Sequence, residues 1–225
     1  MSAVAANARG PRRRLTAARR RHQLIEVALE TFAASGYSAT TMEEIATAAG
    51  VTKPLLYQHF ASKRALYLEL IDDVTTRLVA ALEEAAGAEP NPRRQVEAGV
   101  RAYFRFALEN QAAMRMLYQA PNDDEIADGL RSIEAAITDF LSPLIDADID
   151  DDHRRTLAVA VVGMTEGVTR EWLAEMQRPH ALTTKGALAE GDGSVVGVEA
   201  EAMVLAERVA NLVWGGLRGI RRPET

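Results

Sequence analysis

The segment TTMEEIATAAGVTKPLLYQHFASK, residues 40–63, decides the fold because it predicts two short helices separated by a glycine turn. Thr41 followed three residues later by Glu44 is the spacing of a capping box, in which each side chain bonds the backbone N–H of the other residue. The first helix should therefore begin after Thr41 and span barely two turns. Gly50 should end it, because glycine readily adopts the left-handed conformation that stops a helix.

The second short helix has a proline near its start. Thr52 can cap this helix, and Pro54 is tolerated in the first turn because its missing N–H has no intrahelical partner there. No acidic residue occurs between Val51 and Lys63. Two short helices joined by a glycine turn, the second with polar donors at its N-terminal end, describe a helix-turn-helix, whose second helix lies in the major groove of DNA. Short helix pairs of this kind also occur in helical domains that bind no DNA.

Charge is distributed unevenly along the 225-residue chain. Residues 1–64 carry ten Lys and Arg against four Glu, a net +6, and the remaining residues carry 16 basic and 28 acidic groups, a net −12. The basic N-terminal part is a candidate for binding nucleic acid, because the local surface charge governs that encounter. The absence of cysteine excludes disulfides, thiolate zinc sites and cysteine nucleophiles. The chain has neither a long apolar run nor a signal peptide, so we expect a soluble cytoplasmic protein without membrane association.

Apolar residues recur at spacings of three and four along most of the chain, which predicts an all-α fold. Residues 1–16 have four arginines and no acid, and they predict a mobile basic arm. Residues 180–198 are rich in Gly, Ser and Thr and predict a flexible loop. Besides the two short helices, the predicted helices are Ala17–Ser35, Lys63–Ala86, Arg93–Glu109, Ala112–Gln119, Asp124–Ile145, Asp151–Gln177 and Val198–Ile220.

Residues 19–71 resemble the N-terminal domain of TetR-family transcriptional repressors. The motifs that carry the resemblance are LIEVALETFAASGY (24–37), TTMEEIATAAGV (40–51) and TKPLLYQHFASKRALYLELID (52–72). The resemblance implies a homodimeric repressor that binds a palindromic operator. It also implies a three-helix DNA-binding domain over 17–64 and a helical ligand-binding and dimerisation domain over 65–225.

The residues expected to contact DNA follow from the helix-turn-helix geometry and from this resemblance. The first turn of the second short helix should face the base edges, whereas phenol, imidazole and ammonium groups near its end suit phosphates. Arginines of the arm and of the first helix could reach an adjacent minor groove or the backbone. His59, Pro54 and Leu55 depart from the family pattern, so readout should depend more on thymine methyl contacts and DNA shape. The predicted contacts are Arg12, Arg13, Arg14, Arg19, Thr41, Thr52, Lys53, Pro54, Leu55, Tyr57, His59 and Lys63.

The rest of the chain should form an effector cavity and a dimer interface. The helices over 151–177 and 198–220 are apolar on two faces, and the resemblance assigns such a pair to a four-helix interface between subunits. Segments such as VVGMTEGVTREWLAE resemble fatty-acid-responsive actinobacterial members of the family, which implies a long-chain acyl or acyl-CoA effector. Each expected wall residue is, taken singly, more often ordinary core. The predicted cavity walls are Tyr103, Phe104, Ala107, Met114, Leu117, Tyr118, Ile133, Ile137, Met164, Val168 and Trp172.

Two other functions are alternatives. An architectural DNA-binding protein without an effector would have a solidly packed body. A small helical enzyme has less support, because the four histidines are far apart and no Walker loop, G-x-S-x-G or HExxH motif is present. We therefore predict no enzyme activity, no catalytic residue and no cofactor.

Two polar clusters in the second half of the chain have alternative interpretations. The aspartates over 146–150 are spaced like the first half of a calcium loop, but Asp151 stands where that loop requires glycine, so no metal site is predicted. Glu166 and Arg170 are four residues apart. Their spacing fits a surface ion pair on one helix, and less readily a polar anchor at the mouth of a cavity.

Overall fold

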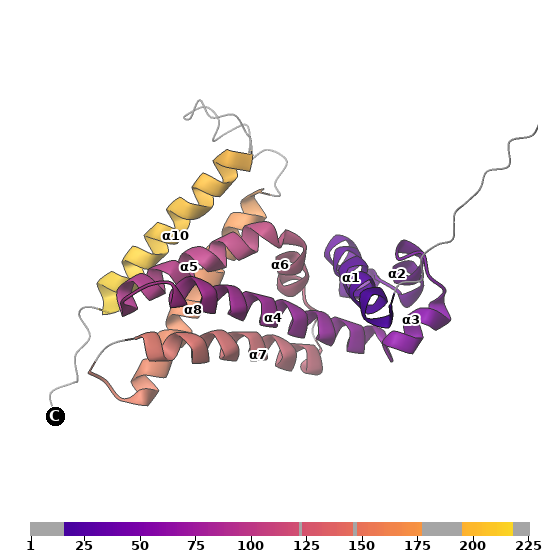
Figure 1. Ribbon diagram of the computed structural model, residues 1–225, viewed down its shortest axis with the longest axis horizontal. Helices are drawn as coiled ribbons and strands as arrows, with labels where there is room; N and C mark the ends of the chain where they lie inside the picture. Colours follow the sequence, from indigo (N-terminus) through magenta and orange to yellow (C-terminus); the bar gives the residue numbers. More distant parts are fainter. Residues whose placement is uncertain (1–15, 122, 146–147, 177–194, 218–225) are drawn as a thin grey trace, which may run out of the picture.

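The computed structural model describes residues 16–121, 123–145, 148–176 and 195–217, and within these ranges the chain is helical with no strand. Helices α1–α3 form a head at one end of an elongated molecule, and α4 runs from the head into a body built from the later helices (Figure 1). The all-α prediction is confirmed. None of the described helices is long and apolar enough to span a bilayer. The elements are α1 (Ala17–Ala39), α2 (Met42–Ala48), α3 (Lys53–His59), α4 (Lys63–Gly87), α5 (Pro92–Glu109), α6 (Gln111–Tyr118), α7 (Asp124–Leu141), η1 (Ser142–Leu144), α8 (Asp151–Met176) and α10 (Val195–Leu217).

Local sequence signals set the ends of the first two helices. The predicted capping box is present: the Thr41 backbone N–H donates to Glu44 Oε2 at 2.7 Å, and the Glu44 N–H donates to Thr41 Oγ1 at 3.2 Å. Gly50 follows α2 with a φ of 63°, the left-handed conformation that the sequence predicts. Gly36 interrupts α1 with a φ of 76°, and a further helical turn then continues to Ala39. The helix predicted over 17–35 is therefore interrupted directly after Ser35, although the element extends beyond Gly36.

The starts of α3 and α4 differ in their capping. Thr52 has the extended backbone of an N-cap, but its side chain makes no capping hydrogen bond. Its exposed hydroxyl can therefore bond a partner outside the head. Pro54 lies in the first turn of α3, as predicted. At α4 the side-chain cap is formed, because Ser62 Oγ accepts from the Ala65 N–H at 3.0 Å.

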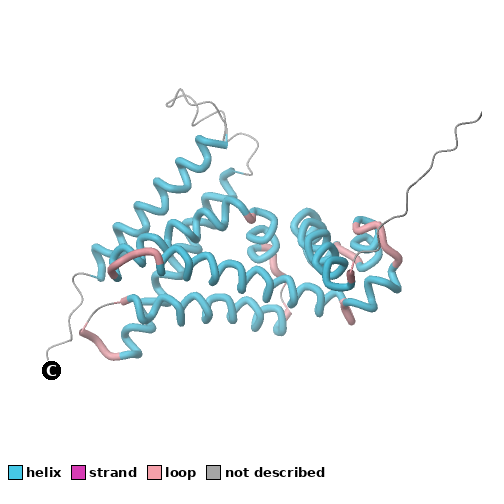
Figure 2. The backbone as a smooth tube through the Cα atoms, viewed as in Figure 1, coloured by secondary structure: helices cyan, strands magenta, loops and turns pink. Residues whose placement is uncertain are grey.

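Helix α4 connects the head to the body. A stripe of apolar residues along it, Leu66, Leu70, Val74 and Leu78, is buried. Helix α4 packs along α5 and α7 in the body (Figure 2). Because α4 is one continuous helix, a displacement of its body half moves the end that carries the head.

The body differs from the prediction mainly at helix ends. Helix α5 begins at Pro92, one residue earlier than predicted, because Asn91 caps it and proline fits a first turn. The helix predicted over 124–145 ends at Leu141 and continues as the 3-10 turn η1. Pro143 explains this change, since proline cannot donate an intrahelical hydrogen bond and clashes with the preceding turn. Helix α10 begins at Val195, three residues before its predicted start. The predicted arm over 1–16, except for Thr16, and most of the predicted loop lie outside the described residues.

Candidate nucleic-acid interface and effector cavity

Helix α3 is fixed to the head by one apolar face. Leu56 is fully buried, and Phe60 at the C-terminal end of the helix is 3% exposed. The opposite face must therefore point to solvent. It consists of Thr52, Lys53, Pro54, Tyr57 and Gln58, with the partly buried Leu55 and His59 at its margins.

Two neighbouring residues give this face hydrogen-bonding capacity. Tyr57 is 45% exposed, one of few large apolar side chains exposed on the described part of the chain. Gln58 is also exposed, and it is not among the DNA contacts predicted from the sequence. The Gln58 amide combines a donor and an acceptor, the pair that recognises adenine in the major groove. Its spacing of four residues from Pro54 was the available signal, because residues four apart share a helix face.

Lys53 is paired with an acid but stays available to DNA. Its Nζ lies 3.5 Å from Glu43 Oε2 on α2, and both side chains are at least half exposed. Exposed pairs of this kind contribute at most about 1 kcal/mol and weaken with salt. A phosphate or a base acceptor can therefore compete for the Lys53 ammonium.

Two predicted DNA contacts have structural roles that the sequence did not predict. The Thr41 hydroxyl donates to Glu44 Oε2 at 3.0 Å, so its proton is engaged within the capping box. The Lys63 ammonium donates to the carbonyls of Tyr37 and Thr40 at 2.8 and 2.9 Å and lies 4.3 Å from the centre of the Tyr37 ring. Both DNA contacts stay predictions, and these hydrogen bonds show that the same polar groups also hold the head together.

The predicted arginine contacts separate into described and undescribed residues. Arg19 is exposed at the start of α1. Arg12, Arg13 and Arg14 lie outside the described residues. The nearby Arg21 instead pairs with Glu69 on α4, and its guanidinium lies 4.9 Å from the centre of the Phe60 ring.

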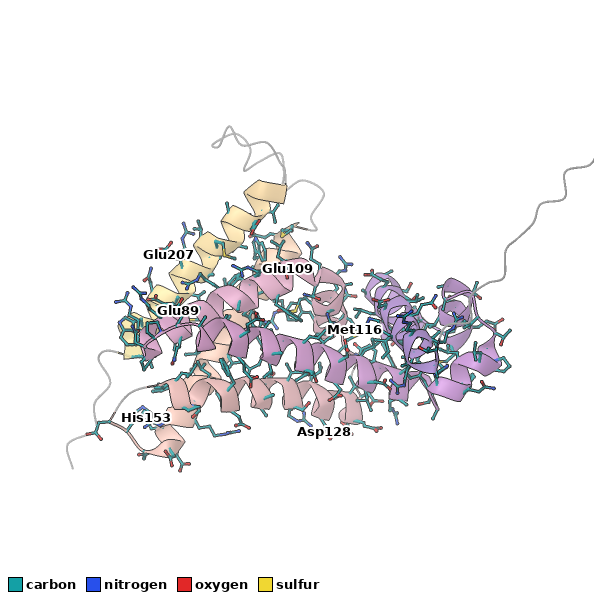
Figure 3. All side chains as sticks on the ribbon, viewed as in Figure 1. Glu89, Glu109, Met116, Asp128, His153 and Glu207 are labelled. Atoms are coloured by element: carbon teal, nitrogen blue, oxygen red, sulfur yellow. The ribbon has the colours of Figure 1, made fainter. Side chains whose placement is uncertain are left out.

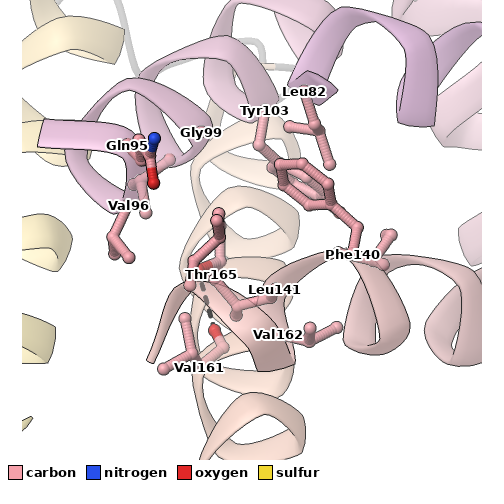
Figure 4. A pocket seen from close by; sticks show the side chains of 13 residues that line it. Leu82, Gln95, Val96, Gly99, Tyr103, Phe140, Leu141, Val161, Val162 and Thr165 are labelled. Atoms are coloured by element: carbon pink, nitrogen blue, oxygen red, sulfur yellow. Dashed lines mark hydrogen bonds between the residues drawn. The ribbon is translucent and has the colours of Figure 1, made fainter. Parts of the chain in front are cut away.

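The body has a small, partly open apolar cavity between α4, α5, α7 and α8. Its volume is about 40 Å³, which suffices for only a few water molecules. Figure 4 shows Tyr103 and Leu82 on one side and Val161 and Leu141 on another. Of the eleven predicted wall residues, Tyr103 and Ile137 line this cavity. Phe104, Ala107, Met114 and Ile133 are buried in the core, Leu117, Tyr118 and Met164 are partly buried beside it, and Val168 and Trp172 lie elsewhere.

A second, wider hollow lies between α8 and α10. Its volume is about 630 Å³, and Val168 and Trp172 line it together with acidic and basic side chains such as Glu171 and Arg208. The predicted wall residues are thus divided between two hollows, because one face of α8 lines the apolar cavity and another face lines the hollow beside α10.

Polar side chains gather beside the apolar cavity. Tyr103 on α5, Tyr118 on α6 and Glu166 on α8 are close enough to affect each other's ionisation. The pKa of Glu166 is raised to about 7, chiefly by burial and also by the carboxylate of Glu134, while Arg170 opposes both. Arg170 makes no ion pair with Glu166 in the described structure but lies 6.0 Å from the centre of the Tyr118 ring. The simple surface ion pair expected between these two residues is therefore not formed.

The chain matches a known protein family. Residues 24–70 match the family model described as bacterial regulatory proteins, tetR family. The HTH-type transcriptional activator FasR of Mycolicibacterium smegmatis is 34% identical over 164 residues, which cover 71% of this chain and 75% of FasR. The chain belongs to the TetR family. A second relative, the HTH-type transcriptional regulator TcmR of Streptomyces glaucescens, is 33% identical over 168 residues, or 68% of this chain and 73% of TcmR.

Solved structures extend the TetR-family fold over the body. A TetR-like transcriptional regulator from Rhodococcus sp. RHA1 gives a TM-score of 0.69 at 24% identity and covers 92% of this chain and 100% of its own. FadR from Bacillus subtilis, solved in complex with stearoyl-CoA, gives a TM-score of 0.66 at 15% identity and covers 89% of this chain and 99% of its own. At these identities the likeness establishes the fold.

Membership of the TetR family identifies the protein as a DNA-binding transcriptional regulator. The matched residues 24–70 contain α2 and α3 entirely. The exposed face of α3 is therefore the candidate surface for DNA, and its individual contacts stay predictions.

Proposed function

We propose that this TetR-family protein acts as a homodimeric repressor that binds a palindromic operator and leaves it when a hydrophobic effector enters the body. The observation that carries the proposal is the solvent face of α3, which has neutral and cationic donors and no acid. The named relatives are transcriptional regulators, so we propose a regulator without catalytic activity. We place it in the cytoplasm, because chromosomal DNA is its proposed partner.

Exposed apolar side chains support a dimer through α8 and α10. Val159 on α8 is 54% exposed, and Val204 and Leu212 on α10 are 46% and 65% exposed. A partner covering these side chains would remove their apolar surface from water. A two-fold dimer over these helices would place two α3 helices about 34–36 Å apart, one turn of B-DNA.

The body supports an effector that has to widen its own site. Ligand cavities usually measure about 300–1,000 Å³, far more than the 40 Å³ between α4, α5, α7 and α8. An acyl chain entering there would move these helices apart, and Leu82 places α4 in the cavity wall. The displacement would reach the head through α4 and change the separation of the two recognition helices. The stearoyl-CoA complex of FadR, which has the same fold, supports a long-chain acyl group or acyl-CoA as the effector.

The direction of regulation depends on what operator binding does to a promoter. FasR is named an activator. KstR2 of Mycobacterium tuberculosis, 35% identical over 100 residues that cover half of KstR2, is named a repressor. We choose repression because it requires only that the dimer occupies its operator, with no contact to polymerase.

Binding measurements on the full-length protein test the proposal. An operator is first obtained by in vitro selection from random duplexes, and its affinity is then measured by fluorescence anisotropy with and without stearoyl-CoA at fixed salt. We expect stearoyl-CoA to weaken operator binding at least tenfold and operator to weaken stearoyl-CoA binding by the same factor, because linkage is reciprocal. Free CoA is the matched control and should change nothing.

Two outcomes would contradict parts of the proposal. Equal operator affinity with and without every acyl compound would favour the architectural DNA-binding protein. Failure to select any preferred duplex would exclude sequence-specific recognition by α3.

A further inference from the structure

Tyr103 connects the apolar cavity to a polar cluster. Its ring lines the cavity, and the residue is 5% exposed. Burial raises the pKa of Tyr103, and the ionisable groups close enough to affect that pKa are Tyr118, Glu166 and Arg170. A chain that filled the cavity would therefore have its end next to these groups.

The Tyr118 hydroxyl is buried and makes no hydrogen bond of good geometry within the described part of the chain, although the Tyr103 hydroxyl is close enough to affect its pKa. Burial also raises the pKa of Tyr118 to about 12, so the phenol is neutral and can donate its proton. A buried hydroxyl without a good hydrogen bond is destabilising, because folding removes its hydrogen bonds to water without fully replacing them. A ligand atom that accepts a hydrogen bond would restore this interaction.

Glu166 is the second open group of the cluster. No hydrogen bond or ion pair joins its carboxyl to another described residue, and Glu134 and Arg170 are the charged groups that affect its ionisation most. With a pKa of about 7 it is neutral at slightly acidic pH, where it can donate a hydrogen bond. Above that pH its negative charge, together with that of Glu134, would repel an anionic ligand.

We propose that Tyr118 and Glu166 bind the carbonyl of an uncharged acyl head group, an ester, thioester or amide, whose hydrocarbon chain lies in the cavity beside Tyr103. The inference depends on the proposed effector and specifies its chemistry. Arg170, the nearby cation, is exposed and faces the Tyr118 ring, so it does not provide a buried partner for a carboxylate. The site therefore discriminates an acyl derivative from the free fatty acid.

The same site lies on the path to the head. Tyr118 is the last residue of α6, and the carbonyl of Met116 in that helix accepts a hydrogen bond from Tyr67 Oη of α4 at 2.7 Å. Met116 lies where α6 approaches the head (Figure 3), and α6 packs against α1. A head group that forms a hydrogen bond with Tyr118 would displace α6. Through the contacts of α6, it would also displace α1 and α4, which support the DNA-binding surface.

Matched probes test the preference for an uncharged head group. Methyl dodecanoate and dodecanoate have the same chain and differ in charge, and their affinities for the full-length protein are measured at pH 6 and pH 8. We expect the ester to bind about tenfold more tightly than the carboxylate at pH 8, with a smaller difference at pH 6. Glu166→Gln should reduce this pH dependence, whereas the control Glu83→Gln, at an exposed position on α4, should leave it unchanged.

Tyr118→Phe tests the hydrogen bond with two readouts of opposite sign. Ester affinity should fall about three- to tenfold because the donor is lost. The melting temperature of the ligand-free protein should rise by about 2–4 °C, because an unsatisfied buried hydroxyl is removed. A merely structural tyrosine would not show this combination.

The outcomes distinguish this inference from the proposed function. Unchanged ester affinity in Tyr118→Phe, or tighter binding of dodecanoate than of its ester at pH 8, overturns the head-group site and leaves the acyl effector standing. If neither probe nor stearoyl-CoA binds at either pH, both the head-group site and the proposed effector are wrong.

Discussion

In the head the Lys63 ammonium donates to two backbone carbonyls, and Thr41 and Glu44 satisfy each other's N–H groups. In the body the Tyr118 hydroxyl and the Trp172 indole N–H are buried without partners among the described residues. Buried polar groups are usually satisfied, and exceptions concentrate where a ligand or water completes them. The comparison indicates a head built to keep one shape and a body whose shape is completed by something else.

The two regions meet at a cluster of aromatic rings. Tyr67 of α4 packs edge-on against Phe32 and Tyr37 of the head, with ring centroids 5.1 and 5.0 Å apart. Its hydroxyl bonds to the carbonyl of Met116 in the body. Arg64 adds a more exposed link, donating to Asp123 at 2.8 Å and Glu125 at 3.2 Å near the start of α7. The head is thus rigid in itself and attached to both α6 and α7, so it can respond to a change in the body as a unit.

The largest expected effect contrasts core truncations in the two regions. Leu56→Ala in α3 removes a fully buried side chain from a closely packed head, and we expect a loss of about 2–5 kcal/mol in the free energy of unfolding. Leu141→Ala, beside the existing cavity, should lie at the lower end of that range because its surroundings are already incompletely packed. Urea denaturation at one fixed protein concentration measures both values. A larger loss for Leu141→Ala would contradict the tighter packing assigned to the head.

The second prediction distinguishes a structural lysine from a DNA-binding one. Lys63→Met keeps the aliphatic stem but leaves the carbonyls of Tyr37 and Thr40 without their donor, so the free energy of unfolding should fall by about 1–3 kcal/mol. The control Lys53→Met alters an exposed ammonium and should change stability little. The salt dependence of operator affinity should show the reverse order, with a slope reduced by about one for Lys53→Met and nearly unchanged for Lys63→Met. A reduced slope in Lys63→Met would instead support its predicted phosphate contact.

Lys63 also shows where sequence reasoning ends. The capping box at Thr41 and the glycine stop at Gly50 were predictable because each depends on residues within four positions. The carbonyls that Lys63 binds lie more than twenty residues away in sequence and meet it only after α1 and α4 have packed. The apolar cavity likewise depends on how distant segments pack. Periodicity therefore identified the inward faces of the body helices but not the unfilled space between α4, α5, α7 and α8.

The fate of the predicted cavity walls illustrates this limit. Phe104 and Tyr103 are neighbours on α5 and both are buried. Only Tyr103 lines the cavity, whereas the Phe104 ring packs 6.1 Å from that of Trp172. Hydropathy cannot separate these two positions, because the difference arises from where α7 and α8 leave space.

The third prediction concerns the pH dependence of the body. The pKa of Glu166 is about 7 in the folded protein, above its ordinary value of 4.5. The folded state therefore binds more protons than the unfolded state between these values, and stability falls as pH rises through that window. Between pH 5 and pH 8 the free energy of unfolding of Glu166→Gln should rise relative to that of the wild type by on the order of 1–2 kcal/mol. This value is below the full effect of the pKa shift because the carboxyl is partly exposed to solvent.

Urea denaturation at both pH values measures this difference. The control Glu43→Gln, on an exposed position of the head, should show no comparable gain. The Glu43 position in the head would then contribute no pH dependence to the free energy of unfolding between pH 5 and pH 8, the range in which Glu166 in the body does. An equal pH dependence in wild type and Glu166→Gln would mean that the Glu166 carboxyl is solvated and not part of a buried cluster.

The smallest expected effect concerns the solvent face of the head. Tyr57→Phe removes one exposed hydroxyl from α3, and if that group contacts a phosphate, affinity should fall by about 0.5–1.5 kcal/mol for every duplex alike. Gln58→Ala should instead change which duplexes are preferred, because an amide in the groove reads base edges. Anisotropy titrations against the selected operator and a set of single base-pair variants separate the two results. The opposite result would be that Tyr57→Phe alters the order of preference while Gln58→Ala lowers all affinities equally. In that case Tyr57 faces the bases and Gln58 faces the phosphates, because the two side chains point about 100° apart around the same helix.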